Sequence, residues 1–268
     1  MTDRIVYLNS ALFYYKEGAG PKIILLFHGF GQDHGVFAGW VDALKAEYTI
    51  YTFDLFFHGK SYWSNPHAIE KEDWKKILQL FLEQEQVASF EIAGFSIGAR
   101  FAFATLENFP QQVNRVVVIA PDGIAPNFWY RLATGTSLMR SFFRNLMLKP
   151  GRLQAIIHFV KFWRFESRGL LRFTEFQINT QEKRQRIYSS WVYFRLLKFD
   201  GQALRDLLNS KKIETIFILG KSDTIISTGK IKKFAKTLVN HQLQIMDAGH
   251  HELITKGIGC IPLKKTNT

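Results

Sequence analysis

The stretch GFSIGAR, Gly94 to Arg100, decides how the rest of the chain is interpreted. It follows the apolar run 90–93, which is typical of a buried strand, and it opens the segment 97–108, which is typical of a helix. A serine between two glycines at such a turn has two interpretations. Ser96 either caps the helix, as serines commonly do, or is a nucleophile held above the sheet on a tight turn.

Short apolar runs alternate with helical patterns on both sides of this turn. The expected strands are 4–9, 11–16, 22–27, 48–53, 90–93, 113–120, 213–219 and 242–246, and the expected helices are 36–47, 70–85, 97–108 and 228–239. Continuously apolar strands separated by helices indicate a mostly parallel sheet that is covered on both faces. The predicted fold class is therefore a doubly wound α/β sheet.

Residues 124–212 interrupt this alternation with helical patterns alone. They hold 17 Lys and Arg against 5 Asp and Glu, so the whole formal net charge of +12 lies in this segment. The segment also holds 16 aromatic residues. Within it, residues 155–165 predict an amphipathic helix with a basic stripe at His158, Lys161 and Arg164. We therefore expect an α/β core of residues 1–123 and 213–268, with 124–212 as a helical insertion.

Composition argues against several classes of protein. No run reaches the roughly 18 uncharged apolar residues that cross a bilayer, and the first residues lack a secretory pattern, so we expect a cytoplasmic protein. The single cysteine, Cys260, allows no internal disulfide. No spacing typical of a metal site or of a nucleic-acid-binding module is present. We expect neither a metal nor an organic cofactor.

Four motifs stand at the ends of expected strands. Gly94 to Gly98 matches G-x-S-x-G, in which the glycines leave room for close packing of strand and helix. His28-Gly29-Phe30-Gly31 follows the strand at 22–27, Asp223 follows the strand at 213–219, and Gly249-His250 follows the last strand. Ligands of open α/β sheets bind at these carboxyl ends. Together, over residues 22–123 and 213–254, the motifs resemble the α/β-hydrolase superfamily.

The resemblance implies a role for each matching residue. It implies Ser96 as nucleophile, His250 as general base and then acid, and Asp223 as the group that orients the imidazole. The backbone amides of Phe30 and Ile97 correspond to the family's oxyanion hole. Two alternatives stay open, because Asp122 also lies between the serine and the histidine in the chain, and His251 stands beside His250.

A further loop, Asp54 to Ser61, resembles the family's D-x-x-G-H-G-x-S, with Phe57 where a glycine is usual. Phe57 and Phe95 are candidate substrate contacts. We assign structural roles to Asp54, His58 and His28, the last as the residue that orders the oxyanion loop.

The resemblance implies a serine hydrolase acting on a small-molecule ester or thioester with an apolar acyl group. A second hypothesis is a lyase or carbon–carbon bond hydrolase acting on a carboxylate, because GFSIGAR is similar to the elbow of the menaquinone-pathway synthase, in which an arginine beside the nucleophile helix binds the substrate carboxylate. Ala99 replaces a glycine that is usual there, and Arg100 could instead be a surface ion-pair partner. A third is a ligand receptor with slow turnover.

The insertion has the place of the family's lid. Its aromatic face either packs on the core and lines the pocket, or lies on an anionic membrane surface. A third interpretation is that its basic residues attract an anionic substrate.

Overall fold

The computed structural model describes residues 2–124, 128–149, 151–152 and 178–261. The chain forms two compact units, a larger one of Met1–Ala125 with Leu197–Thr268 and a smaller one of Pro126–Leu196. The smaller unit ends earlier than the expected insertion, so helix α9 (Gly201–Ser210) belongs to the larger unit. The helix predicted at 155–165 lies outside the described residues.

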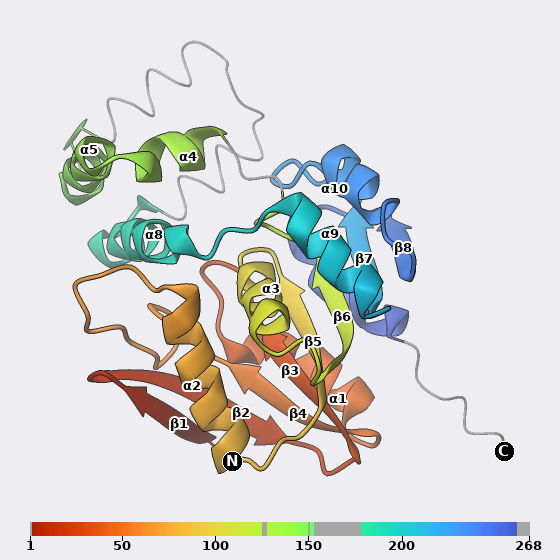
Figure 1. Cartoon of the computed structure of the whole chain (residues 1–268). Coiled ribbons are helices and arrows are strands. Elements are labelled where there is room, and N and C mark those ends of the chain that lie inside the picture. The colour runs from red at the N-terminus through yellow and green to blue at the C-terminus, as the bar shows by residue number, and fades with distance from the viewer. Residues whose placement is uncertain (1, 125–127, 150, 153–177, 262–268) are drawn as a thin grey trace, which may run out of the picture. The chain divides into compact units, whose positions relative to one another are not determined.

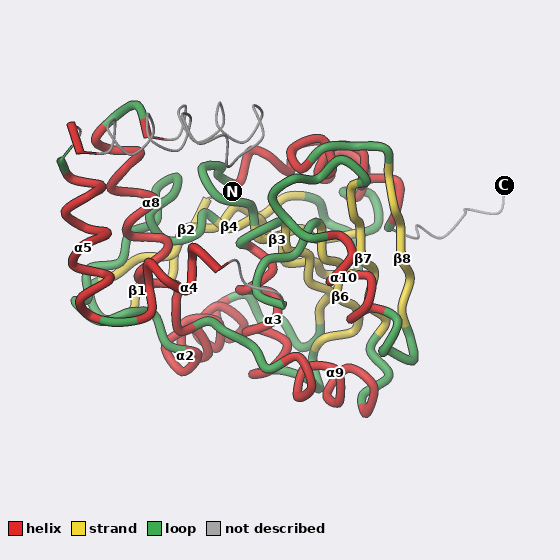
Figure 2. Tube along the Cα trace, turned by 90° about the horizontal axis from the view of Figure 1, so that it is seen from above, coloured by secondary structure: helices red, strands yellow, loops and turns green. Residues whose placement is uncertain are grey.

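The larger unit is built on one eight-stranded sheet in the order β1-β2-β4-β3-β5-β6-β7-β8, with β1 and β8 at its two edges (Figure 2). The strands are β1 (Thr2–Tyr7), β2 (Ser10–Glu17), β3 (Lys22–Phe27), β4 (Tyr48–Phe53), β5 (Phe90–Phe95), β6 (Val113–Ile119), β7 (Glu214–Gly220) and β8 (His241–Met246). The pairs β1–β2 and β2–β4 are antiparallel, and the other five pairs are parallel. This confirms the predicted fold class.

Helices cover both faces of this sheet (Figure 1). They are α1 (Ala38–Leu44), α2 (Lys71–Gln84), α3 (Gly98–Asn108), α9, α10 (Thr228–Ala235) and α11 (Leu253–Lys256), with the short 3-10 segments η1 (His34–Phe37), η3 (His250–Glu252) and η4 (Gly257–Cys260). The sequence of α2 shows why such helices form and bury one side. Its apolar residues recur at helical spacing from Trp74 to Leu82, and the Asp73 carboxylate accepts from the amide of Glu70 at the helix start.

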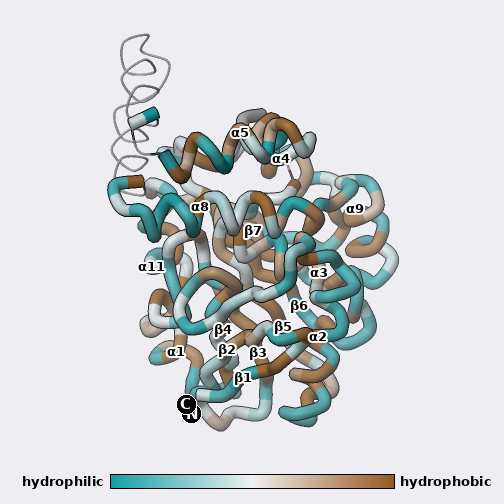
Figure 3. The backbone as a smooth tube through the Cα atoms, turned by 90° about the vertical axis from the view of Figure 1, so that its left-hand side faces the viewer, coloured by the Kyte–Doolittle hydropathy of each residue, from teal (hydrophilic) through white to brown (hydrophobic). Residues whose placement is uncertain are grey.

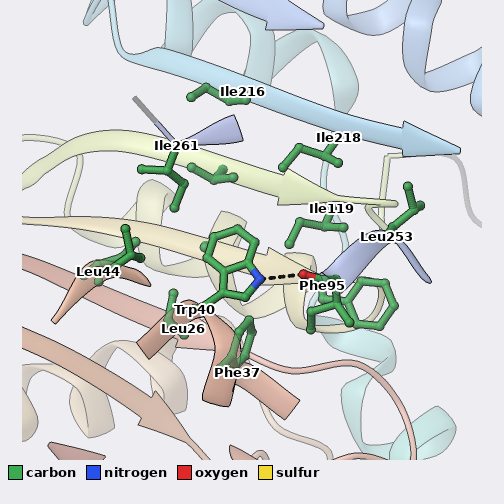
Figure 4. Close-up of a cluster of buried hydrophobic side chains, with 14 of the residues drawn as sticks. Leu26, Phe37, Trp40, Leu44, Phe95, Ile119, Ile216, Ile218, Leu253 and Ile261 are labelled. Carbon is green, nitrogen blue, oxygen red and sulfur yellow. Dashed lines mark hydrogen bonds between the residues drawn. The ribbon is translucent and has the colours of Figure 1, made fainter. Parts of the chain in front are cut away.

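One face of the sheet packs against α1 and α11 (Figure 4). Trp40 of α1 is 1% exposed, and its indole N–H donates to the carbonyl of Ile254, at 2.6 Å. The bond satisfies the one polar atom of the indole ring, so the ring can be buried without cost from an unpaired donor. This contact ties the first helix of the core to the last.

The other face is aromatic. Trp74 of α2 packs edge-on against Phe27 of β3 and Phe101 of α3, with ring centroids 5.7 and 4.9 Å apart. The Trp74 indole N–H donates to the Thr105 hydroxyl. Edge-to-face packing of this kind stabilises a buried aromatic cluster beyond the area that it removes from water. It holds α3, which directly follows the turn that carries Ser96, against the sheet.

The described part of the smaller unit is helical. Its elements are α4 (Phe128–Gly135), α5 (Ser137–Leu148), α8 (Gln181–Tyr193) and η2 (Phe194–Leu196). Phe143 of α5 stacks on Trp191 of α8, and the buried Arg184 donates to the carbonyls of Met147 and Ile178. Among the described residues, no helix of either unit has the length and apolar character needed to span a bilayer.

Candidate active site

Ser96 occupies a strained turn between β5 and α3. Its φ is 51°, in the left-handed region that residues with a side chain seldom adopt. Two backbone hydrogen bonds hold it there: its amide donates to the carbonyl of Ile119, at 2.9 Å, and its carbonyl accepts from the amide of Asp122, at 3.0 Å. Both partners belong to β6 and the loop after it, so the neighbouring strand maintains the turn.

The glycines on either side of Ser96 are required by close approach. A Cβ on Gly98 would stand 2.1 Å from the carbonyl oxygen of Phe27, and one on Gly94 would stand 2.7 Å from the Cα of Ala99. Both distances are far inside van der Waals contact with rigid backbone. The spacing G-x-S-x-G is therefore a packing requirement of this turn.

A chain of hydrogen bonds joins three of the predicted residues. The Nε2 atom of His250 lies 3.0 Å from the Ser96 hydroxyl oxygen, and Nδ1 lies 2.7 Å from a carboxylate oxygen of Asp223. The carboxylate can only accept, so Nδ1 carries the proton and Nε2 is left as an acceptor for the serine. This is the arrangement in which an imidazole can remove the hydroxyl proton.

The surroundings of Asp223 keep its carboxylate charged. Its side chain is 1% exposed, and burial by itself would raise the pKa. The bond from His250 and the amides of Ile225 and Ile226, at 2.8 and 2.9 Å, outweigh burial and lower the pKa. Asp223 therefore presents a fixed negative charge to the imidazole.

The His250 ring, at the start of η3, also packs against Phe95. The Phe95 ring centroid lies 5.1 Å from that of His250, and the side chain of Phe95 is buried. Phe95, predicted as a substrate contact, thus packs against the imidazole. His251 is exposed and turns its ring perpendicular to that of His250, and the bonds to the serine and to the carboxylate belong to His250.

The backbone amides of Phe30 and Ile97 are the donors that the sequence predicts for an oxyanion hole. Within the described residues, neither amide donates to a protein acceptor. Ile97 directly precedes α3, where unpaired amides and the helix dipole favour negative charge. Phe30 lies in the loop after β3, at the same carboxyl edge of the sheet as Ser96.

Comparison with known proteins places the chain in a family. A model of the alpha/beta hydrolase fold matches residues 22–257. The chain belongs to the alpha/beta hydrolase fold family. Both the resemblance and the fold expected from the sequence are thereby confirmed.

Curated relatives of this alpha/beta hydrolase match a shorter stretch. The chain is 29% identical over 113 residues to a pimeloyl-acyl-carrier-protein methyl ester esterase of Vibrio campbellii, a match that covers 42% of this chain and 42% of the relative. It is 27% identical over 112 residues to the dihydrolipoyllysine-residue acetyltransferase component of the acetoin cleaving system of Cupriavidus necator, covering 41% of this chain and 29% of that one. The chain thus matches less than half the length of these relatives.

Solved structures of the same fold match nearly the whole chain. A thermophilic esterase from Thermogutta terrifontis has a TM-score of 0.70 at 18% identity, and the match covers 97% of this chain and 96% of the esterase chain. A hydrolase from Pseudomonas aeruginosa has a TM-score of 0.68 at 18% identity, with 97% and 96% covered. Likeness at this identity shows the fold.

Arg100 and Asp122, two residues considered for the site of this alpha/beta hydrolase, pair with each other. The Arg100 side chain is 2% exposed, and its Nε donates to Asp122, at 2.8 Å. Asp122 also accepts from the amide of Gly123. The contact with His250 is made by Asp223, and the burial of Arg100 favours a structural role over capture of a substrate carboxylate.

Phe57 stands where the family's loop usually has a glycine, and the structure shows how the loop accommodates it. Its φ is 68°, so the backbone keeps the left-handed conformation that a glycine would adopt. The Phe57 amide donates to the carbonyl of Ser61, which closes the turn. Phe57 is half-buried, and its role as a substrate contact stays a prediction.

Sequence reasoning missed several supports of the site. The Gln32 side chain accepts from the amide of Gly29, and the amides of Ile225 and Ile226 donate to the Asp223 carboxylate. An aspartate followed by a turn is a local signal that could have revealed the second. Among the described residues, no group of three or more His, Cys, Asp or Glu is arranged to hold a metal ion.

Proposed function

We propose that this chain is a serine hydrolase that cleaves an ester or thioester with an apolar acyl group. The observation that carries the proposal is the unbroken line of hydrogen bonds from Asp223 through His250 to Ser96, with the serine on its strained turn. The esterase among the curated relatives is consistent with this reaction.

The reaction begins with the Ser96 oxygen attacking the acyl carbon while His250 Nε2 takes the hydroxyl proton. The imidazolium that forms is stabilised by the charged Asp223. The oxyanion of the tetrahedral intermediate accepts from the amides of Phe30 and Ile97. The imidazolium then protonates the departing alcohol or thiol, which leaves an acyl group on Ser96. Water, deprotonated by His250, releases the acid and restores the serine.

Substitution of the serine tests this mechanism. Ser96→Ala is expected to lower kcat on p-nitrophenyl esters by about 10⁴ to 10⁶ while the protein stays folded. A fluorophosphonate probe is expected to label the unmodified protein and not the variant. Ester turnover that survives in Ser96→Ala would remove Ser96 from the mechanism.

The two adjacent histidines provide a matched control. His250→Ala is expected to reduce turnover to a similar extent as Ser96→Ala, because the two residues act as a unit. His251→Ala changes the neighbouring histidine and is expected to leave turnover within about twofold, because the bonds to Ser96 and Asp223 are made by His250. Labelling of the protein by the probe without ester turnover would favour the slow-turnover receptor.

We further propose that residues 124–212 set the acyl preference and that the smaller unit contacts an anionic membrane surface. Leu138 and Phe142 lie one turn apart on α5 and are 72% and 61% exposed, and Arg144 on the same helix is exposed as well. Hydrophobic and hydrophilic segments alternate along α4 and α5 (Figure 3). From residue 123 to residue 165 the sequence has seven Lys and Arg and no Asp or Glu. Apolar side chains among basic ones are the surface that an anionic bilayer attracts.

A further inference from the structure

Two loops at the carboxyl edge of the sheet are joined by hydrogen bonds from a histidine of each loop to a backbone amide of the other. We call residues 28–32, which follow β3, the Phe30 loop, and residues 54–61, which follow β4, the Asp54 loop. His28 of the Phe30 loop accepts through Nε2 from the amide of Leu55, at 2.9 Å. His58 of the Asp54 loop accepts through Nε2 from the amide of Gly31, at 3.0 Å. Each loop is thus bonded to the other by one imidazole.

The hydrogen bonds determine the protonation of both rings. An amide N–H can only donate, so each Nε2 lacks a proton and each Nδ1 carries one. The Nδ1 of His28 donates to the carbonyl of Gly29, at 2.7 Å, and the Nδ1 of His58 donates to the carbonyl of Phe56, at 2.9 Å. Both side chains are essentially fully buried and face each other edge-on, with ring centroids 5.1 Å apart. Burial lowers the pKa of His28 to about 4.

These bonds fall on the two peptide groups that flank Phe30. The carbonyl of Gly29 and the N–H of Phe30 belong to one planar trans peptide, in which they point in opposite directions. By holding the Gly29 oxygen, His28 therefore sets the direction of the Phe30 N–H. His58 holds the N–H of the next peptide, at Gly31, and its ring also packs edge-on against the Phe30 ring, 5.5 Å away.

We propose that His28 and His58 are positioning residues that together aim the Phe30 amide at the oxyanion. The inference rests on the proposed function, because the Phe30 amide is the hydrogen-bond donor to the oxyanion of that proposed reaction. Donors of this kind act only when they are held toward the charge before it develops. A displacement of about 1 Å in such a group can lower the rate about a hundredfold.

Three variants test the proposal. His58→Leu removes the acceptor, and it is expected to lower kcat on p-nitrophenyl esters by about tenfold to a hundredfold while KM changes less than twofold. His58→Gln, whose side-chain oxygen can reach the Gly31 amide, is expected to retain more of kcat than His58→Leu. His241→Leu serves as the control, because His241 also bonds a carbonyl, that of Leu238, but lies on β8 away from both loops. It is expected to leave kcat unchanged.

A transition-state analogue separates positioning from general stability. The affinity of an arylboronic acid, which forms a tetrahedral adduct on the serine, is expected to fall in His58→Leu by the same factor as kcat/KM. An unchanged boronate affinity, or a rise in KM at constant kcat, would overturn the proposal. If His58→Leu does not fold, His28→Gln, which loses the bond to the Gly29 carbonyl, decides in the same assays, and wild-type kinetics in that variant would equally overturn the proposal. Failure of the proposed function is recognised separately, because Ser96→Ala would then keep its turnover.

Discussion

Ser96 combines the proposed role of nucleophile with conformational strain. A left-handed φ of 51° costs a residue with a Cβ roughly 1–2 kcal/mol. The bonds from Ser96 to Ile119 and Asp122 hold the backbone there. Strain that the surrounding structure maintains is typical of residues selected for function and not for stability. In this turn it lifts the hydroxyl to within hydrogen-bonding distance of His250.

The strain predicts that a glycine at this position stabilises the fold. Ser96→Gly is expected to raise the free energy of unfolding relative to Ser96→Ala by about 1 kcal/mol, because glycine adopts the left-handed region without steric cost. Urea unfolding followed by circular dichroism measures the difference. Both variants lack the hydroxyl, so the comparison isolates the backbone. Equal stability of the two variants would show that the turn is not strained.

The strands and most helices were predictable because each follows a local pattern. The runs expected at 22–27 and 48–53 coincide with β3 and β4, since buried strands of a parallel sheet are continuously apolar. The helix expected at 36–47 instead begins with η1, whose start is set by a bond from the amide of Gly35 to Asp33. The assignment of α9 to the larger unit depends on contacts between distant segments, which no local pattern reveals.

The candidate site likewise has residues that the sequence could place and contacts that it could not. Ser96, Asp223 and His250 could be placed because each directly follows a strand, and the carboxyl ends of parallel strands meet at one edge. The sequence could not show that Arg100 pairs with Asp122. It also could not show that His28 and His58 each bond to an amide of the other's loop. Those contacts depend on which loop lies beside which, and strand order in the sheet determines this.

The buried imidazole of His28 predicts how stability depends on pH. Its pKa is lowered to about 4 in the folded protein, against an ordinary value near 6.5. Between these values the unfolded chain binds a proton that the folded one does not, so stability falls as the pH is lowered from about 6.5 toward 4. The contribution of His28 over this range is on the order of 3 kcal/mol.

His28→Gln is expected to remove this contribution, because glutamine does not titrate. Urea unfolding at a series of pH values measures it, as the difference between the slopes of the wild type and the variant. Asp54 provides a contrast, because burial raises its pKa but the amides and side chain around it lower it, and its stabilising effect is lost only in more acidic solution. A slope that is the same in wild type and His28→Gln between pH 6.5 and 4 would contradict the assignment of a neutral, buried His28.

At the scale of the molecule, positive charge is concentrated in the residues that interrupt the hydrolase core. The larger part of the chain outside 124–212 holds 18 basic and 18 acidic residues, so the excess charge belongs to the insertion. Each Lys or Arg near an anionic membrane contributes about 1 kcal/mol to binding. The full chain is therefore expected to sediment with vesicles containing phosphatidylglycerol and to remain in solution with phosphatidylcholine alone.

Substitutions on α4 and α5 locate the contact. The double variant Leu138→Gln with Phe142→Gln is expected to bind the anionic vesicles at least about tenfold more weakly, because two apolar side chains no longer enter the interface. Arg131→Gln with Arg144→Gln is expected to weaken binding about fivefold per charge. Val239→Gln is the control, since Val239 is 77% exposed on the larger unit. Equal binding to neutral vesicles, or self-association in place of binding, would refute the membrane contact.

The separation of Ser96 and His250 along the chain has a consequence for biosynthesis. The two residues are 154 positions apart, and the base enters the chain only after β8. At a ribosomal rate of about 5–20 residues per second, the serine exists for many seconds before the imidazole that is proposed to activate it. Under the proposed mechanism, a nascent chain gains its full ester hydrolysis only when its sheet is complete, and products of translation that stops before β8 would lack the general base.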